Sequence, residues 1–269
     1  MTRLSLVRSY VESRLPGALS PLLRSDREML MTGIDELDRL TGGVPKRGLT
    51  QICAPREVSS GRTTVLLSLM AEVTRAEEFC ALVDAGDCFD PASAEAAGVD
   101  LSRVLWVRCE RRRGIKPFPP QPAQRARGPW TPLEQAFRAA DIVVQNGGFG
   151  LIAVDLATVE ERWVRKTPLS TWFRFARVME RMPAALVFLM NSPAAQSCAA
   201  LTLKLTGGSG RWQGNENVFH ANFLAGVECE FEIGRARVGT GRKPAQSVAG
   251  RFTAVRKSGD RKTRNSVWA

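Results

Sequence analysis

The sequence predicts an α/β protein in which helices flank a predominantly parallel central sheet. Short apolar runs alternate with longer amphipathic segments, which is the order that parallel α/β layering produces. A turn with one glycine and four hydroxyl residues, 54–64, lies between one such run and a helical segment. With 269 residues, 44% of them hydrophobic, the chain is long enough to bury a full core.

The strands are predicted from apolar runs too short for helices. Two more are expected after a glycine pair, and in the first of these apolar and polar residues alternate at Val227, Cys229, Phe231 and Ile233, as in a strand with one solvated face. The predicted strands are LTQIC (49–53), FCALVD (79–84), RVLWVR (103–108), GLIAVDL (150–156), AALVFLMN (184–191), AGVECEFEIG (225–234) and GRFTAVR (250–256).

Helices are predicted over 63–76, 131–146 and 169–182. We expect the last of these to turn one face toward the core, because its apolar residues recur at helical spacing. That face comprises Leu169, Trp172, Phe173, Ala176 and Met179.

The chain carries a net charge of +11, which favours a polyanionic partner such as nucleic acid. Much of the excess lies in an insertion rich in proline and arginine, 111–130, and in the tail from residue 256. We expect an N-terminal helical segment (1–30), a core (31–257) and a basic tail (258–269). The candidate DNA or partner contacts there are Arg111, Arg112, Arg113, Lys116, Arg125, Arg127, Arg256, Lys257, Arg261, Lys262 and Arg264.

Cysteine and histidine usage argues against a metal centre. The six cysteines form no CxxC pair, and His220 is the one histidine, so zinc is not expected. No apolar run reaches the length of a membrane span, and the N-terminus has no signal-peptide core. A cytoplasmic protein without membrane partners is therefore expected.

The turn APREVSSGRTT (54–64) is similar to a phosphate-binding loop, G-x-x-x-x-G-K-[ST]. In that motif backbone N–H groups at a helix N-terminus cradle phosphate, the lysine reaches the outer phosphates and the hydroxyl binds Mg²⁺. Gly61, Thr63 and Thr64 fit the motif, whereas Arg62 replaces the lysine and Arg56 replaces the leading glycine. Arginine keeps the charge, but its guanidinium is broader and planar.

The surrounding motifs resemble those of RecA-type recombinases. TGIDELDRLTGGVPKRG (32–48) precedes the loop and FDPASAEAAGVD (89–100) follows the next strand, both in the family's order. The resemblance, over about residues 30–205, implies a RecA-like core with additional C-terminal strands. It also implies an ATP–Mg²⁺ site that includes Asp90, with Asp155 at the end of 150–156 orienting Mg²⁺ through water.

Three departures from the family predict a degenerate site without catalytic residues. Gly86 stands where the family has the glutamate that positions water, and the neighbouring Asp87 is shorter and shifted in register. Ser93 stands where an aromatic residue stacks on adenine. With Arg62 in the loop, negligible turnover is expected, and any ATP with Mg²⁺ is expected to bind weakly.

The family's DNA-binding loops are reduced as well. Only SPAAQSC (192–198) separates the strand ending at Asn191 from AALTLKL (199–205), which resembles the helix that follows this loop in the family. The other loop, ERWVRKTPLS (161–170), combines charge and an aromatic ring, which suits single-stranded DNA. A capping turn before the next helix explains Thr167 and Pro168 equally well. The candidate contacts in this loop are Arg162, Trp163, Arg165 and Lys166.

A RecA-like core with these features resembles the ImuA group of bacterial accessory proteins in SOS-induced mutagenesis. That resemblance implies translesion synthesis at damaged DNA, with DNA, an ImuB-type Y-family polymerase homologue, an error-prone replicative-type polymerase and RecA as partners. The leading hypothesis is a non-hydrolytic scaffold. The alternatives are a DNA-stimulated ATPase of the RadA or KaiC-like kind, and a pseudo-RecA inhibitor or modulator of RecA filaments. A plain basic α/β domain is the least specific reading.

Overall fold

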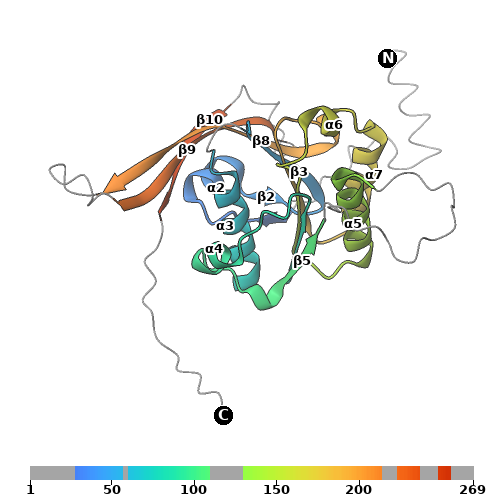
Figure 1. The fold of residues 1–269 in the computed structure, drawn as a ribbon, viewed down its shortest axis with the longest axis horizontal. Coiled ribbons are helices and arrows are strands. Elements are labelled where there is room, and N and C mark those ends of the chain that lie inside the picture. The colour runs from blue at the N-terminus through green and yellow to red at the C-terminus, as the bar shows by residue number, and fades with distance from the viewer. Residues whose placement is uncertain (1–27, 57–59, 110–129, 214–222, 237–247, 256–269) are drawn as a thin grey trace, which may run out of the picture.

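The computed structural model describes residues 28–56, 60–109, 130–213, 223–236 and 248–255 (Figure 1). The predicted insertion contacts and basic-tail contacts, from Arg111 to Arg127 and from Arg256 onward, lie outside these residues, as does most of the predicted N-terminal segment. No helix among the described segments is long and apolar enough to cross a membrane.

An eight-stranded sheet runs through the molecule in the order β10-β9-β8-β3-β7-β6-β4-β5. The six strands from β8 to β5 are parallel, and β9 and β10 extend the sheet as antiparallel neighbours. The strands are β3 (Gly48–Cys53), β4 (Cys80–Asp84), β5 (Val104–Arg108), β6 (Leu151–Asp155), β7 (Ala185–Met190), β8 (Ala199–Gln213), β9 (Phe223–Ala236) and β10 (Val248–Val255). A separate antiparallel pair joins β1 (Met29–Leu30) and β2 (Val44–Pro45).

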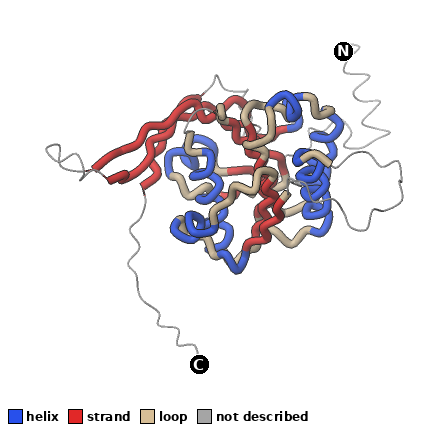
Figure 2. The backbone as a smooth tube through the Cα atoms, viewed as in Figure 1, coloured by secondary structure: helices blue, strands red, loops and turns tan. Residues whose placement is uncertain are grey.

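Helices cover both faces of the central strands (Figures 1 and 2). Helices α2 (Asp35–Thr41), α3 (Arg62–Arg75) and α4 (Pro91–Ala96) pack into one apolar cluster, and the C-terminal strands contribute Phe231 and Phe252 to it. Helices α5 (Pro132–Asn146), α6 (Glu161–Arg165) and α7 (Leu169–Met179) pack into the cluster on the opposite face. Two 3₁₀ turns, η1 (Leu101–Arg103) and η2 (Gln196–Cys198), complete the elements. The predicted α/β class with a mostly parallel sheet is confirmed.

The strands at 49–53, 79–84, 150–156 and 184–191 agree with β3, β4, β6 and β7 within a residue at each end. The two predicted C-terminal strands correspond to β9 and β10, and Cys229, Phe231 and Ile233 are buried as the alternation predicts. Strand β5 is also where it was expected, but it is the edge of the sheet, so it is half exposed rather than buried; Leu105 keeps 45% of its surface.

The expectation of a helix over 199–205 is wrong. This segment begins β8, which pairs in parallel with β3. Leu201, Leu203 and Leu205 are buried on one face of β8. Their spacing of two residues fits a strand and would scatter them around a helix.

The expected core face of α7 is only partly right. Trp172 and Met179 are fully buried, and Phe175 joins them, because residues three and four apart share one face of a helix. Leu169 and Phe173, however, lie beside that face and keep 37% and 53% of their surface exposed.

Candidate nucleotide site

The predicted phosphate loop lies at the carboxyl ends of the parallel strands, where α/β folds place ligands. A cavity of about 100 Å³ opens there, and it brings together three of the predicted site residues, Thr63, Asp90 and Asp155. Gly61, Arg62 and Thr64 do not line it. The remaining lining comes from Leu66, Leu67, Leu82, Cys88, Phe89 and Ser93, and none of these residues is basic.

Gly61 allows the loop to turn into α3. It precedes the helix in the left-handed conformation, with φ of 77°, which glycine adopts without steric cost. A Cβ on Gly61 would overlap the Cys229 sulfur and lie 3.5 Å from Phe252 Cζ. The loop therefore packs directly against β9 and β10.

Arg62 does not reach into the cavity. Its Nη1 lies 3.1 Å from Ala54 O, 3.0 Å from Met190 O and 3.1 Å from Asn191 Oδ1. These oxygens belong to the ends of β3 and β7, so the guanidinium joins the two strands and the start of α3. Burial lowers the pKa of Arg62, and the charge of Asp155 acts in the opposite direction.

Asp155 ends β6 and faces the cavity, as the resemblance implies. Its Oδ1 accepts a hydrogen bond of 2.8 Å from the Ala157 N–H. Burial raises the pKa of Asp155, while this hydrogen bond and the charge of Arg62 lower it. Asp155, which the resemblance expects to orient Mg²⁺, thus lines the cavity, and no basic residue lines the cavity with it.

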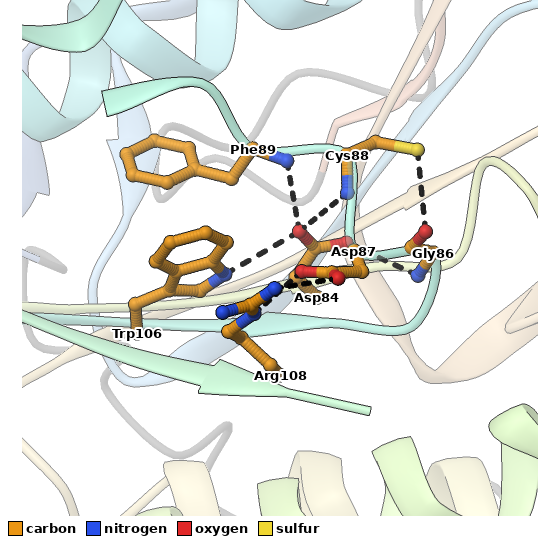
Figure 3. Close-up of polar contacts among 7 residues, drawn as sticks. All are labelled: Asp84, Gly86, Asp87, Cys88, Phe89, Trp106 and Arg108. Atoms are coloured by element: carbon orange, nitrogen blue, oxygen red, sulfur yellow. Dashed lines mark hydrogen bonds and ion pairs between the residues drawn. The ribbon is translucent and has the colours of Figure 1, made fainter. Parts of the chain in front are cut away.

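The turn after β4 is organised by Asp84, which is buried (Figure 3). Its carboxylate accepts hydrogen bonds from the backbone N–H groups of Gly86 (3.1 Å), Cys88 (2.8 Å) and Phe89 (2.9 Å), and from Trp106 Nε1 (3.4 Å). One carboxylate therefore satisfies three backbone donors of the turn, and it fixes the path of residues 85–89.

Gly86, at the position of the family's glutamate, has no room for a side chain. A Cβ there would lie 2.9 Å from Thr158 Cβ and would overlap the hydroxyl and methyl groups of Thr158. Thr158 comes from the segment between β6 and α6. A second element of the fold therefore occupies the space of the missing glutamate.

Asp87 does not replace that glutamate. Its carboxylate forms a two-point ion pair with Arg108 at the end of β5, with Nε–Oδ1 at 2.6 Å and Nη2–Oδ2 at 2.7 Å (Figure 3). This hydrogen-bonded pair lowers the pKa of Asp87. The Arg108 guanidinium also lies 4.8 Å from the centre of the Trp106 ring. Asp87 is held at the sheet edge and does not line the cavity.

Asp90 acts as the N-cap of α4. It accepts hydrogen bonds from the N–H groups of Ala92 (3.3 Å) and Ser93 (3.1 Å), and from the Ser93 hydroxyl (2.5 Å). Ser93 therefore ties back to Asp90, and no ring is present to stack on adenine. Capping alone explains Asp90, although it also lines the cavity.

These residues do not fit ATP–Mg²⁺ by the family's route. Sites for molecules of drug size measure about 300 to 1,000 Å³, whereas this cavity measures about 100 Å³. Arg62, at the position of the motif's lysine, is engaged with the strand ends, and the position of the glutamate is filled. Thr63 and Asp155 are the parts of the site that remain.

The predicted DNA loop at 161–170 contains the short helix α6. Trp163 keeps 49% of its surface exposed, and the cationic groups of Arg162 and Lys166 lie 5.2 and 5.1 Å from the centre of its ring. Arg162 and Arg165 form exposed ion pairs with Glu160 (2.5 Å) and Glu161 (3.6 Å). Three of the four predicted contacts, Arg162, Trp163 and Arg165, thus lie on one short helix, and the fourth, Lys166, is its C-cap.

The capping turn also considered for this segment is present in part. The Thr167 N–H donates to Val164 O at 3.2 Å, and Pro168 precedes α7. No side-chain hydrogen bond caps α7.

The second DNA loop is reduced to a connection held against the core. Gln51 of β3 accepts hydrogen bonds from the N–H groups of Ala194 (3.2 Å) and Ala195 (3.1 Å) through Oε1. Its Nε2 donates to Thr202 Oγ1 at 2.8 Å. A buried side chain therefore fixes the segment that carries the long DNA loop in the family the sequence resembles.

Sequence reasoning missed Thr158, Arg108 and Gln51. Arg108 could have been suspected, because it ends β5 and Asp87 follows β4, and the carboxyl ends of these neighbouring parallel strands meet at one edge. Thr158 and Gln51 carry no such signal, since their partners are set by packing between segments distant in sequence.

Comparison with known proteins agrees with this architecture. Residues 22–112 match the family described as the RecA N-terminal domain. The chain is 33% identical over 132 residues to Protein RecA of Rickettsia bellii (strain OSU 85-389), covering 48% of this chain and 32% of that protein. It is 33% identical over 114 residues to Protein RecA of Rubrobacter xylanophilus (42% and 26%).

A plant protein, DNA repair protein recA homolog 1, chloroplastic, of Arabidopsis thaliana, is 34% identical over 129 residues, covering 48% of this chain and 24% of that protein. The chain spans about a third or less of the length of these curated relatives. The similarity includes the candidate phosphate loop and the turn after β4. The chain therefore has a RecA-like core, and its residues 22–112 carry the match to the RecA N-terminal domain family.

Proposed function

We propose that this protein is a non-hydrolytic accessory scaffold of the ImuA type, which binds DNA and polymerase partners during translesion synthesis. The observation that carries the proposal is the engagement of Arg62 with Ala54, Met190 and Asn191. The arginine at the position of the P-loop lysine thereby stabilises the fold, where that lysine would hold phosphate.

Two further observations support the absence of turnover. Thr158 fills the space beside Gly86, and Arg108 holds Asp87 away from the cavity. The activation of water by a carboxylate at either position is therefore blocked by a different neighbour. Removing the Thr158 side chain would leave Asp87 bound to Arg108, and removing Arg108 would leave Thr158 beside Gly86.

DNA binding is assigned to α6, together with the basic segments predicted at 111–130 and from residue 256. On α6, an exposed Trp163 between two cations has the composition that stacks on unpaired bases and neutralises phosphates. The exposed ion pairs of Arg162 and Arg165 contribute little to stability, so both arginines are free to exchange their carboxylate partners for phosphate. The implied protein partners are an ImuB-type polymerase homologue, an error-prone replicative-type polymerase and RecA.

A DNA-stimulated ATPase is the second candidate, because Thr63 and Asp155 line the same cavity. In that case ATP with Mg²⁺ would bind through these two residues and the N–H groups at the start of α3.

One experiment separates the two candidates. ATP hydrolysis is measured with and without single-stranded DNA, for the protein and for Arg62→Ala. We expect no turnover above background in either, together with retained DNA binding. Turnover that DNA stimulates and Arg62→Ala abolishes would establish the ATPase instead. Co-purification with the ImuB-type polymerase homologue then tests the scaffold role directly.

A further inference from the structure

A groove of about 290 Å³ runs beside α7, at the end of the sheet opposite the candidate nucleotide site. Its wall on α7 is formed by Phe173, Ala176, Arg177 and Glu180. Its floor and far side include Arg47, just before β3, and Ala200 near the start of β8. Neither the nucleotide cavity nor α6 shares these residues.

The groove exists because the connection between the parallel strands β7 and β8 contains no α-helix. Strands β7 and β8 are parallel and lie on either side of β3. Parallel strands are usually joined by a dozen or more residues that include a helix packed on the sheet. Here residues 191–198 make the connection with only the 3₁₀ turn η2. Within the described part of the chain, the side of α7 that faces this connection therefore has no neighbouring helix.

That side of α7 is apolar and exposed. Leu169 and Phe173 are one turn apart and keep 37% and 53% of their surface, although a helix of a folded core normally buries such residues. From Leu169 to Glu180 the helix offers a face about 16 Å long, at 1.5 Å per residue. A partner helix of about three turns has this length.

Beyond the groove, this face of the sheet carries charged side chains that can stay in contact with water. On the same face of the sheet β8 and β9 present Lys204 and Glu230, and the latter is paired with Arg251 of β10 at 2.6 Å. As far as the described residues show, the uncovered apolar surface is therefore limited to the width of one helix beside α7.

The charges around the groove select its occupant. Arg47 and Arg177 form no ion pair with any residue in the described part of the chain, and Glu180 is the one acidic residue that lines the groove. The neighbouring Arg174 is already paired with Asp141 at 2.5 Å. The rim is thus net positive, and it complements acidic side chains on either side of an apolar stripe.

We propose that this groove docks an amphipathic, acidic helix of about three turns from a partner protein. Apolar side chains of that helix would contact Phe173 and Ala176, and its carboxylates would lie beside Arg47 and Arg177. The proposal rests on the scaffold function and deepens it, since it assigns the surface that receives a protein partner.

The test uses two fluorescein-labelled synthetic peptides of about fourteen residues, with the same leucine stripe at helical spacing. One carries glutamates at the flanking positions and the other carries lysines. Fluorescence anisotropy measures their binding to the full-length protein and to Phe173→Ala, Arg177→Glu and the control Phe79→Ala. Phe79 matches Phe173 in residue type and in exposure, at 51%, and it lies before β4. Thermal denaturation verifies that each variant is folded.

We expect saturable binding of the acidic peptide, weakened about tenfold by Phe173→Ala and by Arg177→Glu and unchanged by Phe79→Ala. The lysine peptide should bind more weakly, and it should gain affinity when Arg177 becomes glutamate. No saturable binding, or binding that none of the groove variants alters, would overturn the proposal. A dimer that Phe173→Ala dissociates would assign the groove to a second copy of the chain, which also overturns it.

The scaffold function is tested separately with the ImuB-type polymerase homologue. If that protein binds and the groove variants have no effect, the scaffold stands and the groove proposal fails. If it does not bind at all while the acidic peptide does, the groove stands and the polymerase partner is wrong.

Discussion

Thr158 stands where a side chain on Gly86 would have to go: a Cβ on that glycine would lie 2.9 Å from Thr158 Cβ. Glycine at position 86 therefore does more than remove a carboxylate, because the Thr158 side chain occupies the space that a side chain at position 86 would need. The two positions lie in the segments that follow β4 and β6, which are neighbouring strands in the sheet. Their relationship can be tested by restoring the lost side chain.

Gly86→Glu should destabilise the protein by about 1 to 3 kcal/mol, the usual cost of overpacking, and should give no ATP turnover. Thr158→Gly removes the obstructing side chain, so the double variant should recover part of that loss. Urea denaturation measures the free energy of unfolding, with Thr158→Gly alone as the control. Equal stability of Gly86→Glu and the unchanged protein would mean that the Thr158 side chain moves aside freely.

Arg62→Ala should lower the free energy of unfolding by about 2 kcal/mol, since hydrogen bonds from a charged donor contribute about 1.5 to 3 kcal/mol. Arg62 is half-buried, which places the expected loss toward the lower part of that range. Arg56→Ala, at an exposed position of the same loop, is the matched control and should change stability by less than about 0.5 kcal/mol. If Arg62→Ala and Arg56→Ala lowered the free energy of unfolding equally, the hydrogen bonds of Arg62 would not be a specific source of stability.

Cys88 should be the first thiol to react with Ellman's reagent in the native protein, because it is the exposed one of the six cysteines. Burial raises the pKa of Cys53 and Cys80 to about 12 and that of Cys109 to about 11, so these thiols should react only on unfolding. Cys88 also lines the cavity, which makes its reaction rate a probe of nucleotide binding. We expect ATP with Mg²⁺ to leave the rate unchanged. Protection of Cys88 by ATP would instead show that the cavity admits nucleotide.

Trp163→Ala should weaken binding of single-stranded DNA about tenfold, because stacking of a base on an aromatic ring contributes about 1 to 3 kcal/mol. Lys166→Ala should reduce the salt dependence of binding by about 0.7 in the slope of log K against log salt, the value for one phosphate contact on a single strand. The Phe79→Ala variant serves as the control for loss of an exposed ring. Unchanged affinity and slope in both α6 variants would remove α6 from the DNA surface.

Arg108→Ala should raise the pKa of Asp87 toward its ordinary value of 3.8, because the ion pair with Arg108 is what lowers it. A lowered pKa in the folded state means that Asp87 contributes stability above about pH 4, and that this contribution is lost as the pH falls through the folded pKa. Titration of the Asp87 carboxyl by NMR measures the change. Arg251→Ala, which removes a different exposed ion pair, should leave this pKa where it is.

The sequence predicted the central strands and the three longer helices, because each combines the apolar spacing of its element with a suitable length. It failed over 199–205, where likeness to a helix in the family outweighed the spacing of Leu201, Leu203 and Leu205. It also placed Phe173 in the core, because helical spacing identifies an apolar stripe without showing whether a neighbour covers it. In the site, the residue changes at 62 and 86 were visible. Their physical outcome was not, since the partners of Arg62 include Met190 and Asn191, far away in sequence.

The contacts of Arg62 have one more consequence. All three acceptors of its hydrogen bonds are part of the same chain, so the join between the ends of β3 and β7 is made once, during folding, and needs no metabolite to maintain it. A protein that depends on bound nucleotide for stability becomes more labile when the supply falls. The join at Arg62 is made within the chain, so a change in nucleotide supply would leave these three contacts intact.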